Sequence, residues 1–486
     1  MSDDILRLEP QAVWKNFYSL TQIPRPSGHE DKIRKFIADF GRNHGLDTLI
    51  DEVGNVIIRK PAMSGMEDRK GVILQAHLDM VPQKNSGMHH DFENDPIVTV
   101  IDGEWVHARD TTLGADNGMG VAAAMAVLES TELKHGPVEV LFTSEEETGM
   151  TGALGLKPGL LKGEIMMNMD SEDEGELFIG CAGGINGTMT FNFRGQTLPA
   201  GYMGFEIKVT GLKGGHSGMD INLGRGNANK IMNRVLYEGH ALYGLLLASI
   251  EGGSLRNAIP RESQASVAVP VAMAESFLDG LSGLSGKIKS EIATTDPGLI
   301  IEAIPAAIPD TVIEEGVFVR LLDAVYACPN GVMHMSSEMD GLVETSNNLA
   351  IIKSSRGAVA VKCLLRSSVD SAREDLVAMI RSVSELAGAV SVFDQGYPGW
   401  KPNPNSPILK SMREIYKAKF GKTPEIKAVH AGLECGIIGG SYPELDMISF
   451  GPTIRYPHSP DEKVNIASVG RFWDFLVETL ANIPHA

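Results

Sequence analysis

The sequence predicts an α/β domain with a mostly parallel central sheet, into which a second, α+β domain is inserted. Three observations lead to this fold class. At 486 residues the chain exceeds the size of one ordinary hydrophobic core. Apolar runs alternate with helical patterns towards both ends of the chain, which is typical of parallel α/β layers. The middle of the chain instead alternates apolar and polar residues, as half-exposed antiparallel strands do.

The outer parts of the chain, 1–186 and 399–486, are expected to form the α/β domain together. The strands predicted there from apolar runs are 71–76, 138–143, 164–169 and 446–450. Two segments have the apolar stripe of a helix, namely the alanine-rich segment 118–130 and the segment 467–483. Each predicted strand leads into a turn with polar residues, so the candidate functional residues lie at the strand ends.

The middle of the chain, 187–398, is expected to form the inserted domain. The segments 205–210, 265–271 and 358–364 have the alternation of antiparallel strands, and 370–387 has the spacing of an amphipathic helix.

Composition excludes several classes of function. The net charge of −19 repels phosphate backbones, so we expect no nucleic-acid partner. The chain has no run of 18 apolar residues and its N-terminus lacks the zones of a signal peptide, so we expect a cytoplasmic protein with no membrane partner. The cysteines are far apart in the sequence, which fits a reducing compartment and excludes a thiolate metal site. They are Cys181, Cys328, Cys363 and Cys435.

Residues of the types that bind metals follow the predicted strands or precede the first predicted helix. They are His77, Asp79, Asp116, the acidic run 145–147, Asp170 and His458. Ligands of open α/β sheets bind at the carboxyl ends of the strands, so we expect these side chains to converge on one edge.

Each of these residues also has a structural interpretation when it is taken alone. His77 fits a core histidine, Asp116 fits a helix N-cap, and Asp170 fits a strand-ending turn. The acidic run fits a solvated turn, and His458 fits a rigid loop between prolines. Together, two imidazoles and three carboxylates make a ligand set that suits Zn²⁺, Co²⁺ or Mn²⁺. From the residues alone, a dinuclear metal site and a set of unrelated structural roles both remain open.

Five motifs resemble the aminoacylase and carboxypeptidase family of co-catalytic zinc exopeptidases. They are QAHLDM, TTLGADNG, EEETG, NMDSEDEGE and GPTIRYPHSPDE. The resemblance extends almost end to end and is strongest to a bacterial dipeptidase branch of that family. It implies a three-layer zinc-exopeptidase catalytic domain with a mostly parallel central sheet, and it makes the inserted α+β domain a lid and dimerisation domain.

The resemblance also implies two divalent metal ions, Zn²⁺ first, with Co²⁺ and Mn²⁺ as alternatives. His77 and Asp170 would bind one ion, and Glu147 and His458 would bind the other. Asp116 would bridge the two ions, and the peptide bond after it would be cis.

Catalytic roles follow from the same resemblance. Asp79 would orient the His77 ring, and Glu146 would be the general base that activates a metal-bridging water. Glu145 is an additional acid beside this pair, which leaves the register of the triplet to be tested.

The inserted domain supplies three further residues by resemblance. His216 of GGHSG would polarise the scissile carbonyl. Asn257 of RNAIP and Arg366 of LLRSS would bind the C-terminal carboxylate of the substrate, for which a guanidinium is well suited because its fork binds carboxylates bidentately.

The function implied by the resemblance is a metal-dependent dipeptidase that hydrolyses Xaa-His dipeptides such as carnosine, with room for other dipeptides. Its partners would be a small dipeptide substrate and a second copy of the chain in a homodimer. A tripeptidase or an N-acyl amino acid amidohydrolase could use the same dinuclear site. A purely structural metal is a third interpretation, which an unligated Glu146 argues against.

Overall fold

The computed structural model describes residues 2–486, and the chain forms two compact units. The first unit consists of Met1–Gly180, Pro402–Ala428 and Leu433–Ala486. The second consists of Cys181–Lys401 and Val429–Gly432. Among residues 2–486, no helix combines the length and the apolar composition that a membrane span requires.

An eight-stranded sheet forms the centre of the first unit, in the order β1-β2-β6-β3-β7-β23-β8-β22. Its four middle strands are parallel: β6 (Val138–Thr143), β3 (Val72–His77), β7 (Ile165–Asn168) and β23 (Asp446–Ser449). The outer strands are β1 (Asp47–Ile50), β2 (Val56–Lys60), β8 (Glu176–Cys181) and β22 (Glu425–Val429). β2 pairs with β6, and β8 with β23, in antiparallel fashion. The sheet is therefore mixed, with four parallel strands at its centre, where all four strands predicted for this domain are found.

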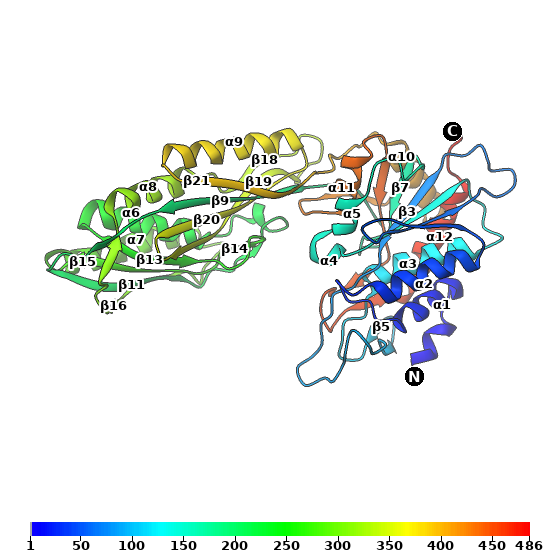
Figure 1. Cartoon of the computed structure of the whole chain (residues 1–486), viewed down its shortest axis with the longest axis horizontal. Helices are drawn as coiled ribbons and strands as arrows, with labels where there is room; N and C mark the ends of the chain where they lie inside the picture. Colours follow the sequence, from blue (N-terminus) through cyan, green and yellow to red (C-terminus); the bar gives the residue numbers. More distant parts are fainter. Residues whose placement is uncertain (1) are drawn as a thin grey trace. The chain divides into compact units, whose positions relative to one another are not determined.

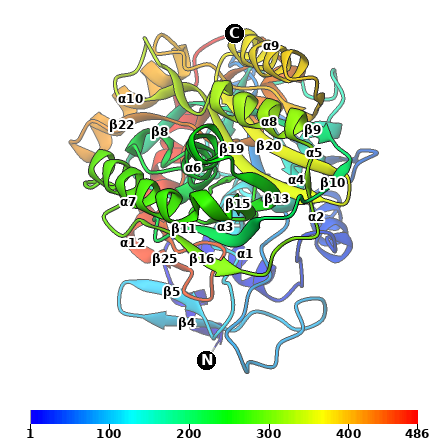
Figure 2. The ribbon, with the colours of Figure 1, turned by 90° about the vertical axis from the view of Figure 1, so that its left-hand side faces the viewer.

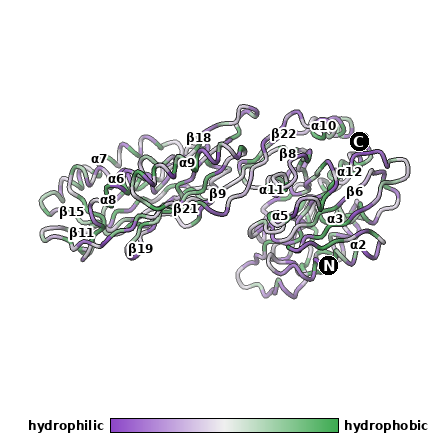
Figure 3. Tube along the Cα trace, turned by 45° about the horizontal axis from the view of Figure 1, so that its top comes forward, coloured by the Kyte–Doolittle hydropathy of each residue, from purple (hydrophilic) through white to green (hydrophobic). Residues whose placement is uncertain are grey.

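Helices cover this sheet, and β3 and β6 are buried along their whole length. α3 (Ala115–Glu129) packs on β3, and α1 (Gln11–Thr21) packs on α3 (Figure 1). The buried, alanine-rich α3 is one of the hydrophobic segments in Figure 3. The Asp116–Asn117 peptide at its start is cis, as expected. The other helices are α2 (Asp31–Asn43), α4 (Glu146–Gly149), α5 (Thr151–Gly155), α10 (Pro407–Phe420), α11 (Glu434–Ser441), α12 (Ile466–Ala481) and the 3₁₀ helix η1 (Ser2–Arg7).

A small antiparallel sheet completes the first unit, in the order β24-β25-β5-β4. Its strands are β24 (Ile454–Arg455), β25 (Lys463–Asn465), β5 (Trp105–Ala108) and β4 (Thr99–Asp102). β25 pairs with β5 and so connects the C-terminal part of the chain to the hairpin near residue 105.

The second unit is built on an antiparallel sheet in the order β16-β11-β15-β13-β19-β20-β9-β21, with β18 paired to β19. Its strands are β9 (Gly183–Asn192), β11 (Tyr202–Thr210), β13 (Leu246–Gly252), β15 (Ser263–Pro270), β16 (Ile300–Ala306), β18 (Gly331–Met335), β19 (Val343–Ser355), β20 (Ala358–Ser367) and β21 (Val390–Tyr397). Two short pairs accompany it: β10 (Gly195–Thr197) with β17 (Thr311–Ile313), and β12 (Gly215–His216) with β14 (Ala258–Ile259).

Helices pack on this second sheet: α6 (Ala228–Tyr243), α7 (Ala274–Glu291), α8 (Glu315–Ala327) and α9 (Asp370–Leu386). α6 contacts both α7 and α8, and the three lie together in Figures 1 and 2. Phe205, Ile207 and Val209 of β11 are buried, whereas Glu206 and Lys208 between them are partly exposed. The alternation expected for this strand is therefore observed.

Candidate metal centre

The candidate ligands follow the carboxyl ends of the central parallel strands. His77 is the last residue of β3, Asp170 follows β7, and the Glu146–Glu147 pair begins α4 after β6. Parallel strands present their carboxyl ends at one edge of the sheet, which brings these three segments together. Asp116 joins them from the start of α3, and His458 joins them from the loop after β24.

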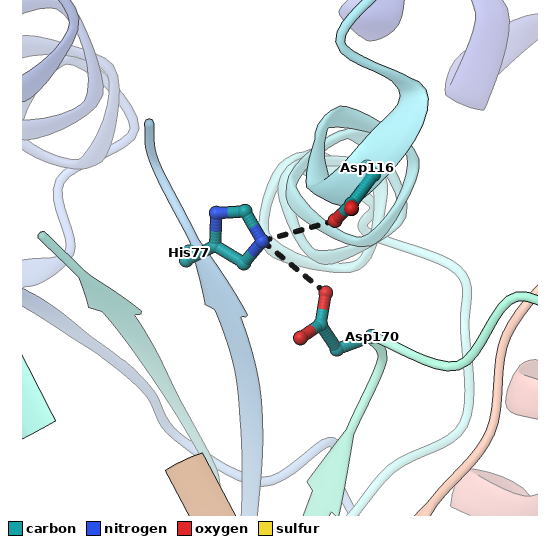
Figure 4. Close-up of side chains that lie close together, drawn as sticks. All are labelled: His77, Asp116 and Asp170. Atoms are coloured by element: carbon teal, nitrogen blue, oxygen red, sulfur yellow. Dashed lines mark hydrogen bonds and ion pairs between the residues drawn. The ribbon is translucent and has the colours of Figure 1, made fainter. Parts of the chain in front are cut away.

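The first ligand group is formed by His77, Asp116 and Asp170 (Figure 4). Nε2 of His77 lies 3.1 Å from Oδ1 of Asp116 and 3.3 Å from Oδ1 of Asp170. The imidazole is 1% exposed. Burial opposes its protonation, but the carboxylates of Asp170, Asp116 and Asp79 outweigh burial and raise the pKa of His77 well above its usual value.

The second ligand group is formed by Asp116, Glu147 and His458. Nε2 of His458 lies 3.2 Å from Oδ2 of Asp116 and 2.9 Å from Oε2 of Glu147. These two contacts raise the pKa of His458 to about 11. One oxygen of Asp116 thus faces each histidine, so the two groups share this carboxylate.

Both groups fit divalent cations. Within each, the ligand atoms lie within 4.8 Å of one another, and neighbouring ligands of a tetrahedral ion with bonds of 2.0 to 2.2 Å are about 3.4 Å apart. Oε1 of Glu147 is buried with no hydrogen-bond partner among residues 2–486. Burial, with the charges of Asp116 and Glu147, raises the pKa of Asp170 to about 6 against the opposing effect of His77. Buried carboxylates that repel one another are stabilised by cations.

Asp79 connects the His77 ring to the loop that carries the glutamates. Its Oδ1 lies 3.2 Å from Nδ1 of His77, on the side of the ring opposite the candidate ligands. The carboxylate also accepts hydrogen bonds from the backbone N–H groups of Glu146 at 3.0 Å and Glu147 at 3.2 Å. Burial alone would raise the pKa of Asp79, but the ion pair with His77 and the hydrogen bond from Ser27 lower it to about 2. Asp79 therefore remains ionised and contacts both segments.

Two residues of the acidic triplet lie among the candidate ligand atoms, and the third bonds elsewhere. Glu145 has a left-handed backbone (φ 54°) and accepts a hydrogen bond from Oγ1 of Thr151 at 2.5 Å. A Glu146 carboxylate oxygen lies within 4.8 Å of ligand atoms of His77 and Glu147. Burial raises the pKa of Glu146 well above its usual value. Glu146 and Glu147, the pair chosen from the sequence, thus lie beside His77, and the division of roles between them stays a prediction.

A buried polar cluster beside His77 was not predicted from the sequence. Oε2 of Glu434 accepts hydrogen bonds from Nε2 of Gln75 at 2.6 Å and from Oγ1 of Thr143 at 2.7 Å. Burial raises the pKa of Glu434 to about 7. The one sign of this cluster in the sequence near His77 is Gln75, an amide inside an apolar run. Glu434 follows almost 360 residues later, so no local pattern connects the two residues.

The imidazole of His216, a residue of the second unit, has a defined tautomer. Its Nδ1 accepts hydrogen bonds from the backbone N–H groups of Gly218 at 3.2 Å and Met219 at 3.1 Å. Burial, with the positive charge of Arg366, lowers the pKa of His216. The ring is therefore neutral with its proton on Nε2, so Nε2 is a hydrogen-bond donor.

Arg366 lies close to His216 in the same unit. The arginine is buried, its Nη1 donates to the Tyr397 hydroxyl at 3.1 Å, and its Nε approaches Oγ of Ser217 at 3.5 Å. Asn257 is exposed, and its backbone oxygen accepts a hydrogen bond from Ser217 N at 2.8 Å. All three residues expected to bind substrate therefore belong to the second unit, whereas all the candidate metal ligands belong to the first.

Comparison with known proteins identifies the family. Residues 73–482 match the model of peptidase family M20/M25/M40. The chain is 46% identical over 485 residues to the cytosol non-specific dipeptidase of Escherichia coli (strain K12), which covers 99% of both chains. It is 48% identical to the crystal structure of aminoacylhistidine dipeptidase from Vibrio alginolyticus, with a TM-score of 0.94 and complete coverage of both chains. A Staphylococcus aureus tripeptidase structure shares the fold at 16% identity, with a TM-score of 0.56 and coverage of 98% and 99%. The chain therefore belongs to peptidase family M20/M25/M40.

Proposed function

We propose that the protein is a metal-dependent dipeptidase that hydrolyses Xaa-His dipeptides, carnosine among them, and accepts other dipeptides. The observation that carries this proposal is the full-length likeness to two dipeptidases, at 46% and 48% identity. One relative is named an aminoacylhistidine dipeptidase and the other a non-specific dipeptidase, which supports histidine as a preferred rather than a required residue.

Two divalent cations complete the proposed site, and Zn²⁺ is the ion that the imidazole and carboxylate ligands suit best. His77, Asp116 and Asp170 would hold one ion, and Asp116, Glu147 and His458 the other. When bound, such ions polarise the scissile carbonyl and lower the pKa of water.

Glu146 is proposed as the general base. Its carboxylate would take a proton from the attacking water and deliver it to the nitrogen of the leaving amine. A general base works best when its pKa is near the operating pH, and burial moves the pKa of Glu146 upwards in that direction. Asp79 would maintain the geometry, because it accepts the backbone N–H of Glu146 and lies against His77.

Residues of the second unit are proposed to recognise the rest of the substrate. The neutral His216 would donate its Nε2 proton to the carbonyl oxygen as negative charge develops there. Arg366 and Asn257 would bind the free carboxylate at the C-terminus, which restricts the substrates to those with an exposed end. We further propose a cytoplasmic location, which the cytosolic naming of one relative supports. A homodimer that assembles through the second unit is also proposed.

A small substrate panel tests the proposal. Purified protein would be assayed on carnosine, Ala-His, Ala-Ala, a tripeptide and N-acetyl-histidine, before and after chelation, and again after reconstitution with Zn²⁺, Co²⁺ or Mn²⁺. We expect dipeptide hydrolysis that is lost on chelation and restored by metal. Hydrolysis of N-acetyl-histidine or of the tripeptide in preference to every dipeptide would replace the proposal with an amidohydrolase or tripeptidase. Inactivity of the metal-loaded protein on every substrate would favour a purely structural role for the metal.

A further inference from the structure

The turn that presents Asp116 is held by a buried carboxylate from another part of the chain. Oε2 of Glu462 accepts hydrogen bonds from the backbone N–H groups of Leu113 at 2.7 Å and Gly114 at 2.9 Å. Oε1 accepts from Ala115 N at 2.7 Å and Asp116 N at 3.2 Å. Four consecutive peptide groups thus converge on one side chain, and the last of them belongs to the shared candidate ligand.

A buried guanidinium holds the same turn through a carbonyl group. Nη2 of Arg25 donates to the backbone oxygen of Gly114. Nη1 donates to the backbone oxygens of Leu78 at 2.8 Å and Asp79 at 2.9 Å, directly after the end of β3. Arg25 therefore ties the Gly114 turn to the segment that carries His77 and Asp79.

The energetics of these two residues are unusual. Arg25 is 3% exposed and Glu462 is 2% exposed. Burying a single charge is strongly unfavourable unless hydrogen bonds compensate for the lost water. Here the compensation comes from peptide groups of the ligand-bearing segments. Movement of these segments would therefore remove the hydrogen bonds that replace water around the two buried charges.

Gly114 shows how closely the turn is held. Its φ of 72° lies in the left-handed region. A Cβ atom there would lie 2.6 Å from Nη2 of Arg25 and 2.9 Å from Sδ of Met80. Any other residue at this position would displace the guanidinium or the turn.

The segments held in this way carry most of the candidate metal ligands. Arg25 fixes the end of β3, which bears His77. Glu462 fixes the backbone of Asp116 and lies four residues after His458 in the sequence. The hydrogen bonds of Arg25 and Glu462 together form a clamp on these three segments. The clamp acts on both ligand groups at once, because both contain Asp116.

We propose that Arg25 and Glu462 are positioning residues that preset the Asp116 carboxylate for both cations before any metal binds. This inference rests on the metal centre of the proposed function. Ligand groups ordered during folding need no further ordering when the metal arrives, so the clamp increases metal affinity. Residues that orient metal ligands typically contribute about 10 to 100-fold to metal affinity or activity.

Glu462→Gln tests the proposal, with Glu139→Gln as the matched control. The amide replaces one acceptor oxygen with an N–H₂ group that faces backbone donors, while the size of the side chain is kept. Glu139 is also buried, and its Oε2 accepts two consecutive backbone N–H groups, from Lys162 at 2.6 Å and Gly163 at 2.8 Å. It lies at the amino end of β6, away from the ligand edge.

Zn²⁺ affinity would be measured by competition with a chromophoric chelator, together with the thermal unfolding midpoint of the metal-free proteins. We expect Glu462→Gln to weaken binding of both ions by about 10 to 100-fold. Its kcat at limiting Zn²⁺ should fall and recover at high Zn²⁺. Glu139→Gln should lower the unfolding midpoint and leave Zn²⁺ affinity unchanged. Wild-type Zn²⁺ affinity in Glu462→Gln would overturn the proposal.

A second measurement does not depend on the variant folding. Hydrogen exchange of metal-free wild-type protein should show slow exchange of the amides of 113–116, because the protein itself holds them. Fast exchange that becomes slow only on adding Zn²⁺ would show that the metal orders the turn and would overturn the proposal. Failure of the wild-type protein to bind Zn²⁺ at all would instead refute the proposed function.

Discussion

Metal binding should release protons, because the imidazoles of the two ligand groups are protonated when no cation is present. The pKa of His458 is raised to about 11 by Asp116 and Glu147, and that of His77 is raised well above its usual value. Both shifts favour the protonated imidazole near neutral pH. A histidine binds metal only as the neutral imidazole. Loading two cations at this pH should release at least two protons, one for each ring.

The same linkage determines how affinity changes with pH. Below the pKa of its imidazole, each ligand group must lose one proton to bind, so the apparent affinity should rise about tenfold for each unit of pH increase. Between pH 6 and pH 8 this amounts to about 100-fold for the cation that His458 would hold, because the pKa of that ring is raised to about 11. Affinity should thus increase towards alkaline pH and show no optimum near pH 6.5, the usual pKa of histidine.

Isothermal titration with Zn²⁺ in two buffers of different ionisation enthalpy, both at pH 7.5, counts the released protons. His458→Gln should release about one proton fewer and bind one cation much more weakly. His485→Gln is the control, because His485 forms an exposed pair with Asp68 at 2.8 Å and contacts neither ligand group. Zn²⁺ binding that releases no protons would refute the reasoning, since it would mean that both imidazoles are neutral in the metal-free protein.

Three further predictions concern single residues. Glu146→Gln should retain both metals by elemental analysis and lose about 10² to 10⁴-fold in kcat. Glu145→Gln should remain active. The opposite pattern would move the register of the triplet by one residue. Arg366→Ala should raise KM about 100-fold for free dipeptides, as expected for losing a buried charge partner, and much less for C-terminally amidated ones. The exposed Arg356→Ala should change neither KM, and an equal effect of Arg366→Ala on both substrates would exclude carboxylate recognition. Asp79→Asn should lower metal affinity or kcat/KM by about 10 to 100-fold; wild-type values for both would show that Asp79 does not orient His77.

The centre of the fold was predictable because its strands are buried on both faces. β3, β6, β7 and β23 therefore appear in the sequence as mainly apolar runs, with few polar residues such as Gln75 and Glu139 inside them. The outer strand β1 is short and half-exposed, and it has no such pattern. The sequence consequently predicted the parallel centre of the sheet but not its antiparallel flanks.

The sequence predicted the site residues that follow the ends of strands. It did not predict the residues that hold the site through hydrogen bonds to the backbone. His77 and Asp170 follow apolar runs, so their meeting at one edge follows from parallel strands. Arg25 and Glu462 act through peptide groups, and Glu462 lies 346 to 349 residues from the amides that it accepts. A side chain that binds the main chain requires no partner of a particular type, so the sequence gives no sign of which segment Arg25 or Glu462 holds.

Anomalous diffraction from a crystal of the Zn²⁺-loaded protein shows whether two cations share Asp116. We expect two peaks, each about 2.0 to 2.2 Å from one oxygen of Asp116. One peak should also contact His77, and the other should contact His458. A single peak, or two peaks that do not share Asp116, would contradict this expectation.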